Sequence, residues 1–312
     1  MPWDRRRWYS PLPVNGPERS SDPPAHVPGG LDPPFALLRD LLARSGRFAR
    51  LEDLQGMSGI LFRTYWHLRI RESAPRRWSS RSAEACSGDP IARAAEAYGV
   101  RLARGDVPGL SELEPGIETI EGSPTIERRI DFLRRSIRTG IDYSDEKELR
   151  REGIFAAGAA AYGALLEDLS RPLSSFLPES AEEAARLVPE AASLSLPEEV
   201  LPPLSLAVAL RRTLRAFGTA RLRLAGYLDR AGNFIDSSAS LSPFVKEGEA
   251  LLRAGDRIAG PSLLDLAAGA GADGALDSLL GAKVLSSVRR DVGAAAAEHR
   301  KGIDRLRRAF PR

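Results

Sequence analysis

Cys86 lies in the segment AEACSGDP, ahead of an apolar stretch whose pattern predicts a helix from about Pro90. A thiol beside a helix N-terminus can ionise readily and act as a nucleophile. His67 is the nearest histidine in the sequence, and Asp89 follows Cys86 closely. A thiolate, a base and an acid could together form a thiol-dependent site. A lone cysteine is more often a small buried apolar side chain, so both interpretations stay open.

The segment LLDLAAGAGADG, residues 263–274, has the glycine spacing of a nucleotide-binding loop at Gly269, Gly271 and Gly274. Such a loop joins a strand to a helix and opens a unit in which further βα repeats follow. Only 38 residues follow Gly274, and their pattern is helical. We therefore expect a small-residue connection between two helices here, with no nucleotide or other cofactor.

Metal and disulfide chemistry are disfavoured by composition. A single cysteine excludes an intramolecular disulfide and a cysteine-based zinc site, and three histidines are too few for a histidine-rich metal site. His299 lies on the apolar face of the last predicted helix. That position favours a packed, hydrogen-bonded histidine over a metal ligand or a catalytic base.

Two clusters of side chains are candidates for binding a macromolecular partner. The N-terminal cluster combines aromatic residues with arginine, types that dominate protein interfaces: Trp3, Arg5, Arg6, Arg7, Trp8 and Tyr9. The C-terminal cluster lies within residues 283–312, which hold nine basic and three acidic side chains: Arg300, Lys301, Arg305, Arg307 and Arg308. Such residues usually form a solvated face, and an acidic partner or nucleic acid is the alternative. The net charge of the whole chain, +3, is too small to imply nucleic acid by itself.

The N-terminal cluster belongs to a proline-rich segment, residues 1–34, which holds nine of the 23 prolines. Such a composition cannot bury enough apolar surface to offset its ordering entropy, so we expect an extended arm. No apolar core of a signal peptide follows Arg5–Arg7, and no apolar run reaches the length of about 18 residues that a membrane span needs. A cytoplasmic protein is therefore expected.

Residues 35–122 are expected to form a small mixed α/β domain. Apolar spacing predicts helices at 35–43, 51–55 and 91–98. Extended segments are predicted at 60–70, where a helix also fits, and at 100–102 and 113–120.

Residues 123–312 are expected to form a helical bundle. One helix begins at Ser123–Pro124, and Ser144 is expected to cap the next, which runs through Phe155 and Tyr162. Further helices are predicted at 181–187, 206–228 and 285–310. The fold class is therefore mainly α, with a small α/β N-terminal part and a helical bundle C-terminal region.

Six stretches, in this order, resemble a family of papain-like bacterial proteins: FALLRDLLARSG, LEDLQGMSGILFRTYWH, RRWSSRSAEACSGDPIARAAEAYGV, GAAAYGALLEDL, LRRTLRAFGTARLRLAGYLDRAG and RRDVGAAAAEHRKGIDRLRRAF. The family is related to the acyltransferase of butirosin biosynthesis and to bacteriocin-type cysteine peptidases. The resemblance covers most of residues 35–312. It implies an α/β domain whose first helix opens with a nucleophilic cysteine, followed by a helical region.

The chain departs from this family at the residues that carry the chemistry. The family's cysteine would fall near Pro33, Pro34 or Phe35, where there is none, and residues 112–151 contain no histidine. Without thiolate and imidazole the family's acyl transfer has neither nucleophile nor base.

The resemblance therefore implies a degenerate pseudoenzyme. We expect a non-catalytic helical interaction or scaffold protein that binds a protein partner or itself through the arm and the basic C-terminal helix. The alternatives are a thiol-dependent acyltransferase or peptidase that uses Cys86, His67 and Asp89, and nucleic-acid binding through the C-terminal cluster.

Overall fold

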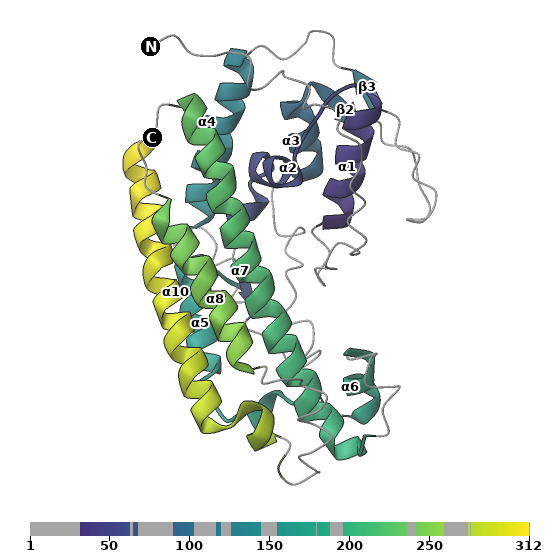
Figure 1. The fold of residues 1–312 in the computed structure, drawn as a ribbon, viewed down its shortest axis with the longest axis vertical. Helices are drawn as coiled ribbons and strands as arrows, with labels where there is room; N and C mark the ends of the chain where they lie inside the picture. Colours follow the sequence, from purple (N-terminus) through teal and green to yellow (C-terminus); the bar gives the residue numbers. More distant parts are fainter. Residues whose placement is uncertain are drawn as a thin grey trace, which may run out of the picture.

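The structure is a computed structural model that describes residues 32–62, 65–67, 90–102, 117–119, 126–144, 155–178, 180–187, 196–235, 241–258, 274 and 276–311. Within this part of the chain the fold is mainly α, and its C-terminal region is helical (Figure 1). No helix among these residues combines the length and the apolar character that crossing a membrane would require.

Three long helices form the centre of the molecule: α7 (Leu201–Ile235), α8 (Ser242–Ile258) and α10 (Ala282–Ala309). They lie side by side (Figure 1), and α8 runs antiparallel to both neighbours. A shorter helix, α5 (Ala159–Asp168), packs against α10. Near one end of α7 lie η5 (Leu173–Phe176), α6 (Ala181–Leu187) and η7 (Glu198–Val200).

Around the other half of α7 lie the helices of the N-terminal half of the chain (Figure 1): α1 (Asp32–Arg44), α2 (Leu51–Met57), α3 (Pro90–Ala97), α4 (Ile126–Tyr143) and the 3₁₀ turn η2 (Ile60–Phe62). Two close approaches hold this group together. A Cβ atom on Gly56 would lie 2.4 Å from the Tyr227 ring of α7, and one on Gly140 of α4 would lie 2.2 Å from the Phe62 ring.

The strands described are three residues long and pair two by two. β1 (Tyr65–His67) is antiparallel to β4 (Phe155–Ala157), and β2 (Val100–Leu102) is antiparallel to β3 (Ile117–Thr119). These short ladders do not test the expected α/β domain of residues 35–122. That domain and the boundaries at 34 and 122 stay predictions.

Two apolar cores lie along the long helices. The first contains Leu210, Leu214 and Phe217 of α7 with the residues of α8 and α10 beside them. The second contains Leu224, Tyr227 and Leu228 of α7 together with apolar side chains of α1 to α4. Residues from both sides of position 122 therefore share one core.

The sequence predicted the long helices α7 and α10, and their positions are confirmed. The helix expected to begin at Ser144 is wrong in its first half, because Phe155 lies in β4 and the helix starts at Ala159. The Ser144 hydroxyl instead donates to the Gly140 carbonyl and closes α4. The strand expected over 60–70 is confirmed only at 65–67, since 60–62 form η2.

Candidate functional site

A layer of polar side chains crosses the apolar interior where the two cores meet. On α7, Arg221 lies between Phe217 of the first core and Leu224 of the second. On α8, Glu247 lies between Phe244 and Ala250, which belong to the second and first cores. On α10, His299 lies between Ala296 of the first core and Ile303 of the second. We call Tyr162, Arg221, Glu247 and His299 the polar layer.

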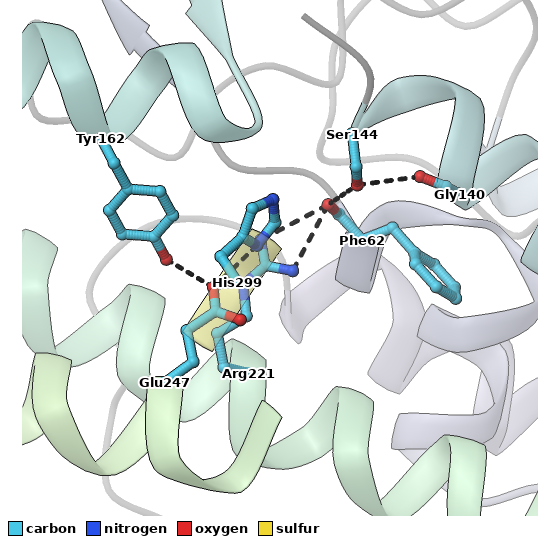
Figure 2. Close-up of polar contacts among 7 residues, drawn as sticks. All are labelled: Phe62, Gly140, Ser144, Tyr162, Arg221, Glu247 and His299. Atoms are coloured by element: carbon cyan, nitrogen blue, oxygen red, sulfur yellow. Dashed lines mark hydrogen bonds and ion pairs between the residues drawn. The ribbon is translucent and has the colours of Figure 1, made fainter. Parts of the chain in front are cut away.

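The layer converges on a single oxygen atom, Oε1 of Glu247 (Figure 2). The Tyr162 hydroxyl of α5 donates to it at 2.5 Å, His299 Nδ1 lies 3.0 Å away, and Arg221 Nε lies 3.1 Å away. Because a carboxylate oxygen only accepts, Nδ1 carries the hydrogen of the His299 contact. The side chains of Glu247, Arg221 and His299 are 0%, 1% and 1% exposed, so no water screens these contacts from outside.

Arg221 also joins the layer to the N-terminal half of the chain. Its two terminal nitrogens each lie 3.4 Å from the Phe62 carbonyl oxygen at the end of η2. The Ser144 hydroxyl, at the end of α4, lies 3.5 Å from the same oxygen (Figure 2). One guanidinium therefore bridges α8 and η2, which come from distant parts of the sequence.

Helices α7 and α8 approach each other closely beside the layer. A Cβ atom on Gly218 of α7 would lie 2.8 Å from the Gly248 carbonyl oxygen of α8, and one on Gly248 would lie 2.9 Å from the Gly218 carbonyl oxygen. Both glycines adjoin the layer, one three residues before Arg221 and the other directly after Glu247. The ion pair therefore lies where α7 and α8 nearly touch.

The positive groups of the layer overcome the cost of burying Glu247. Burial alone raises the pKa of a carboxyl group because it disfavours the charged form. The charges of His299 in its protonated form and of Arg221, with hydrogen bonds from His299 and Tyr162, outweigh burial and lower the pKa of Glu247. Glu247 Oε2 and His299 Nε2 are buried, and neither has a hydrogen-bond partner within the described part of the chain.

Tyrosine, glutamate and histidine are groups that transfer protons in enzymes. Here they face one another (Figure 2), and their side chains are almost completely buried. The arrangement can compensate the charge of Arg221 and can take up a proton. In this structure it presents no group to a substrate in solvent.

A second arginine–carboxylate pair joins α7 to α2. Arg230 donates to Asp53 Oδ1 from Nε at 2.8 Å and from one terminal nitrogen at 2.5 Å. Here burial has the larger effect, so the pKa of Asp53 is raised despite the hydrogen bond and the charge of Arg230. This pair is partly open to solvent, with side chains 26% and 12% exposed for Arg230 and Asp53.

Most of the site residues predicted from the sequence cannot be placed. Cys86, Asp89, the glycine loop up to residue 273, and the N-terminal cluster lie outside the described residues. His67 lies in β1, where the structure describes the backbone only. The thiol-dependent site therefore stays a prediction.

The C-terminal cluster lies on α10, beyond the polar layer. Its members Arg300, Lys301, Arg307 and Arg308 are exposed, and Arg305 is half-buried. Two of them have acidic partners one turn away on the same helix: Lys301 pairs with Glu298 at 2.7 Å, and Arg307 with Asp304 at 3.3 Å. Arg308 Nε donates to the Asp304 carbonyl oxygen at 3.2 Å.

Of the polar layer, sequence reasoning assigned a role only to His299, as a packed and hydrogen-bonded histidine, and this is confirmed. Arg221 and Glu247 were missed, although both interrupt an apolar helical face. Arg221 stands four residues after Phe217 and three before Leu224, and Glu247 stands three after Phe244. A charged residue at such a position requires a buried partner, which was the available signal.

Comparison of the chain with protein-family models, with curated proteins and with solved structures gives no match. The resemblance to the papain-like family therefore stays an expectation from sequence.

Proposed function

We propose that the protein is a non-catalytic helical binding protein that contacts a macromolecular partner through the exposed basic side chains of α10, together with the N-terminal arm. The observation that carries this proposal is how α10 distributes its polar groups. His299, the histidine of this helix, is buried against Glu247. The residues directly after it, Arg300 and Lys301, are exposed.

The exposed residues share one face of the helix. Arg300, Asp304, Arg307 and Arg308 follow one another at helical spacing, so they lie on the side opposite Ile303 and Leu306 of the second core. Asp304 supplies the acidic charge on this face and is already paired with Arg307. The face is basic overall and suits a partner with acidic groups.

Site-specific photocrosslinking in cells tests this proposal. A photoreactive amino acid replaces Arg300 or Arg308 in the full chain, and the matched control position is Arg134, an exposed arginine on α4. We expect a covalent product at both α10 positions that is absent at position 134. Products that do not differ between the two helices, or none, would contradict the proposal.

The identity of the product separates the kinds of partner. A product of twice the chain mass indicates self-association. A nuclease-sensitive product indicates the nucleic-acid alternative, for which binding should also weaken steeply with salt.

Charge reversal adds a quantitative measurement. The double variant Arg300→Glu and Arg308→Glu should weaken partner binding, whereas Arg134→Glu and Arg138→Glu, which change the net charge equally, should not. Removing residues 1–31, which precede α1, tests the arm. It should lower the yield of the product and leave the melting temperature nearly unchanged.

A further inference from the structure

The polar layer depends on the charge of one carboxylate. Tyr162 from α5, Arg221 from α7 and His299 from α10 all contact Oε1 of Glu247. Their contacts are therefore not independent, because any event that removes the negative charge weakens all of them together.

The carboxylate has a second oxygen that can carry a proton while the three contacts on the first stay in place. Oε1 carries the three contacts, whereas Oε2 is buried and has no hydrogen-bond partner among the residues described. A proton on Oε2 neutralises Glu247 while the guanidinium of Arg221 stays charged. The neutral carboxyl group no longer compensates the buried charge of Arg221, and losing this compensation destabilises the arrangement of helices around it.

The element most directly released by this event is α5. Tyr162 lies in its first turn, and the helix follows directly after strand β4, which pairs with β1. Gly158 alone separates β4 from α5, and its φ of +56° lies in the left-handed region. A Cβ atom there would lie 2.5 Å from the Ser144 carbonyl oxygen. Glycine therefore lets the chain change direction at this link.

We propose that the polar layer is a proton-operated lock that holds α5 against α8 and α10, and that protonation of Glu247 releases α5 together with the β1–β4 ladder that packs on it. The lowered pKa of Glu247 supports this assignment because it shows that the layer favours the ionised carboxylate. The inference does not depend on what the protein binds.

The groups that face Glu247 come from each element around it: Tyr162, Arg221 and His299. The other charged residues of α8, including Lys246, Glu249 and Asp256, are exposed and lie on its solvent side. Asp256 pairs with Arg215 of α7 there. Acidification of these surface groups does not alter the charge balance of the layer directly.

Hydrogen exchange measured from pH 7 to pH 3, corrected for the pH dependence of intrinsic exchange, tests the lock. In the wild-type chain, the amides of α5 and of residues 65–67 and 155–157 should lose protection before those of α7 and α8. Between the ordinary pKa of a glutamate and the lowered pKa of Glu247, the opening equilibrium should grow by up to about tenfold for each unit that the pH falls, as the uptake of one proton requires.

Three variants predict different shifts of this transition. Glu247→Gln imitates the protonated carboxyl, so α5 should already be released at pH 7, with no further acid transition. His299→Gln removes the charge that lowers the pKa of Glu247 the most. The pH at which α5 is half released should therefore be higher in this variant. Tyr162→Phe removes one hydrogen bond, and its midpoint should move in the same direction by a smaller amount.

Asp53→Asn is the control, since it changes a buried carboxylate outside the layer and should leave the midpoint of α5 in place. If Glu247→Gln does not fold, the His299 and Tyr162 variants still decide the matter. The proposal is overturned if those two variants leave the midpoint unchanged. It is also overturned if α5 loses protection only together with α7 and α8, in one global step.

Discussion

Helix α7 carries two arginines nine residues apart, Arg221 and Arg230, and each binds a buried carboxylate from another helix. Glu247 is the more deeply buried of the two acids, yet its pKa is lowered, whereas the pKa of Asp53 is raised. Burial alone would give the opposite order. The number and arrangement of compensating groups therefore decide the sign of the shift.

The two sites differ in how many elements supply those groups. Glu247 receives contacts from three helices, and they include a second group that can carry positive charge, His299. Asp53 receives two hydrogen bonds from one guanidinium, and its desolvation outweighs them. A carboxylate that joins several helices is thus stabilised in its charged form, and one that pairs with a single arginine is not.

Removing each arginine should give the largest difference between the sites. Arg221→Ala leaves Glu247 buried next to apolar cores, and such a loss costs about 3–5 kcal/mol of unfolding free energy. Arg230→Ala leaves Asp53 at a partly open site, where a loss of about 1 kcal/mol is expected. Urea unfolding at pH 7 measures both values. Equal losses would mean that the two sites do not differ in the way their pKa shifts indicate.

The long helices could be predicted because their apolar spacing persists over many turns, as at Leu210, Leu214 and Phe217. Helix α8 was not predicted, although Ser242–Pro243 is a typical helix start and Phe244, Leu251, Ala254 and Ile258 continue at helical spacing. Strand β4 was predicted as helix. A three-residue strand next to an alanine-rich helix has no periodicity of its own.

The polar layer could be predicted only in part. Arg221, Glu247 and His299 each occupy an apolar helical face, so the sequence indicates that each needs a buried partner. Which residues pair depends on the antiparallel alignment of α8 with α7 and with α10, which places position 221 beside 247 and position 247 beside 299. That alignment is set by packing across the whole interface, including the contact of Gly218 with Gly248.

A substitution at the glycine contact beside the layer should have an effect of intermediate size. Gly248→Ala places a methyl group 2.9 Å from both the Gly218 carbonyl oxygen and the Leu222 side chain. Backbone must shift to admit it, so we expect a loss of about 1–3 kcal/mol. Gly293→Ala on α10 meets nothing within 4 Å and should gain about 0.5–1 kcal/mol from helix propensity.

Thermal and urea unfolding of both glycine variants measure these effects. If Gly248→Ala is as stable as the wild type, the close approach of α7 and α8 does not contribute to the stability of the helix packing beside the layer. The Arg230–Asp53 pair lies beside a different close contact, that of Gly56 with the Tyr227 ring, which Gly248→Ala does not alter. Asp53 should therefore keep its pKa shift in this variant. A titration of Asp53 by NMR would check this.

The smallest effect, and the one that separates the two carboxylates most directly, is their opposite response to pH. Glu247 has a lowered pKa when folded, so its stabilising contribution is present above its unfolded pKa and is lost as pH falls through the folded value. Asp53 has a raised pKa, so its contribution is greatest in acid and declines as pH rises from the unfolded value through the folded one.

Asp53→Asn removes the pH-dependent contribution of Asp53 and leaves that of Glu247 in place. Relative to the wild type, this variant should therefore be less stable at pH 4 than it is at pH 7. Its difference at pH 7 should stay within about 1 kcal/mol, because Arg230 is partly exposed and can turn to water. Urea unfolding at the two pH values gives both differences. A variant that becomes relatively more stable as the pH falls would show that Arg230, and not burial, governs Asp53, and the two sites would then work alike.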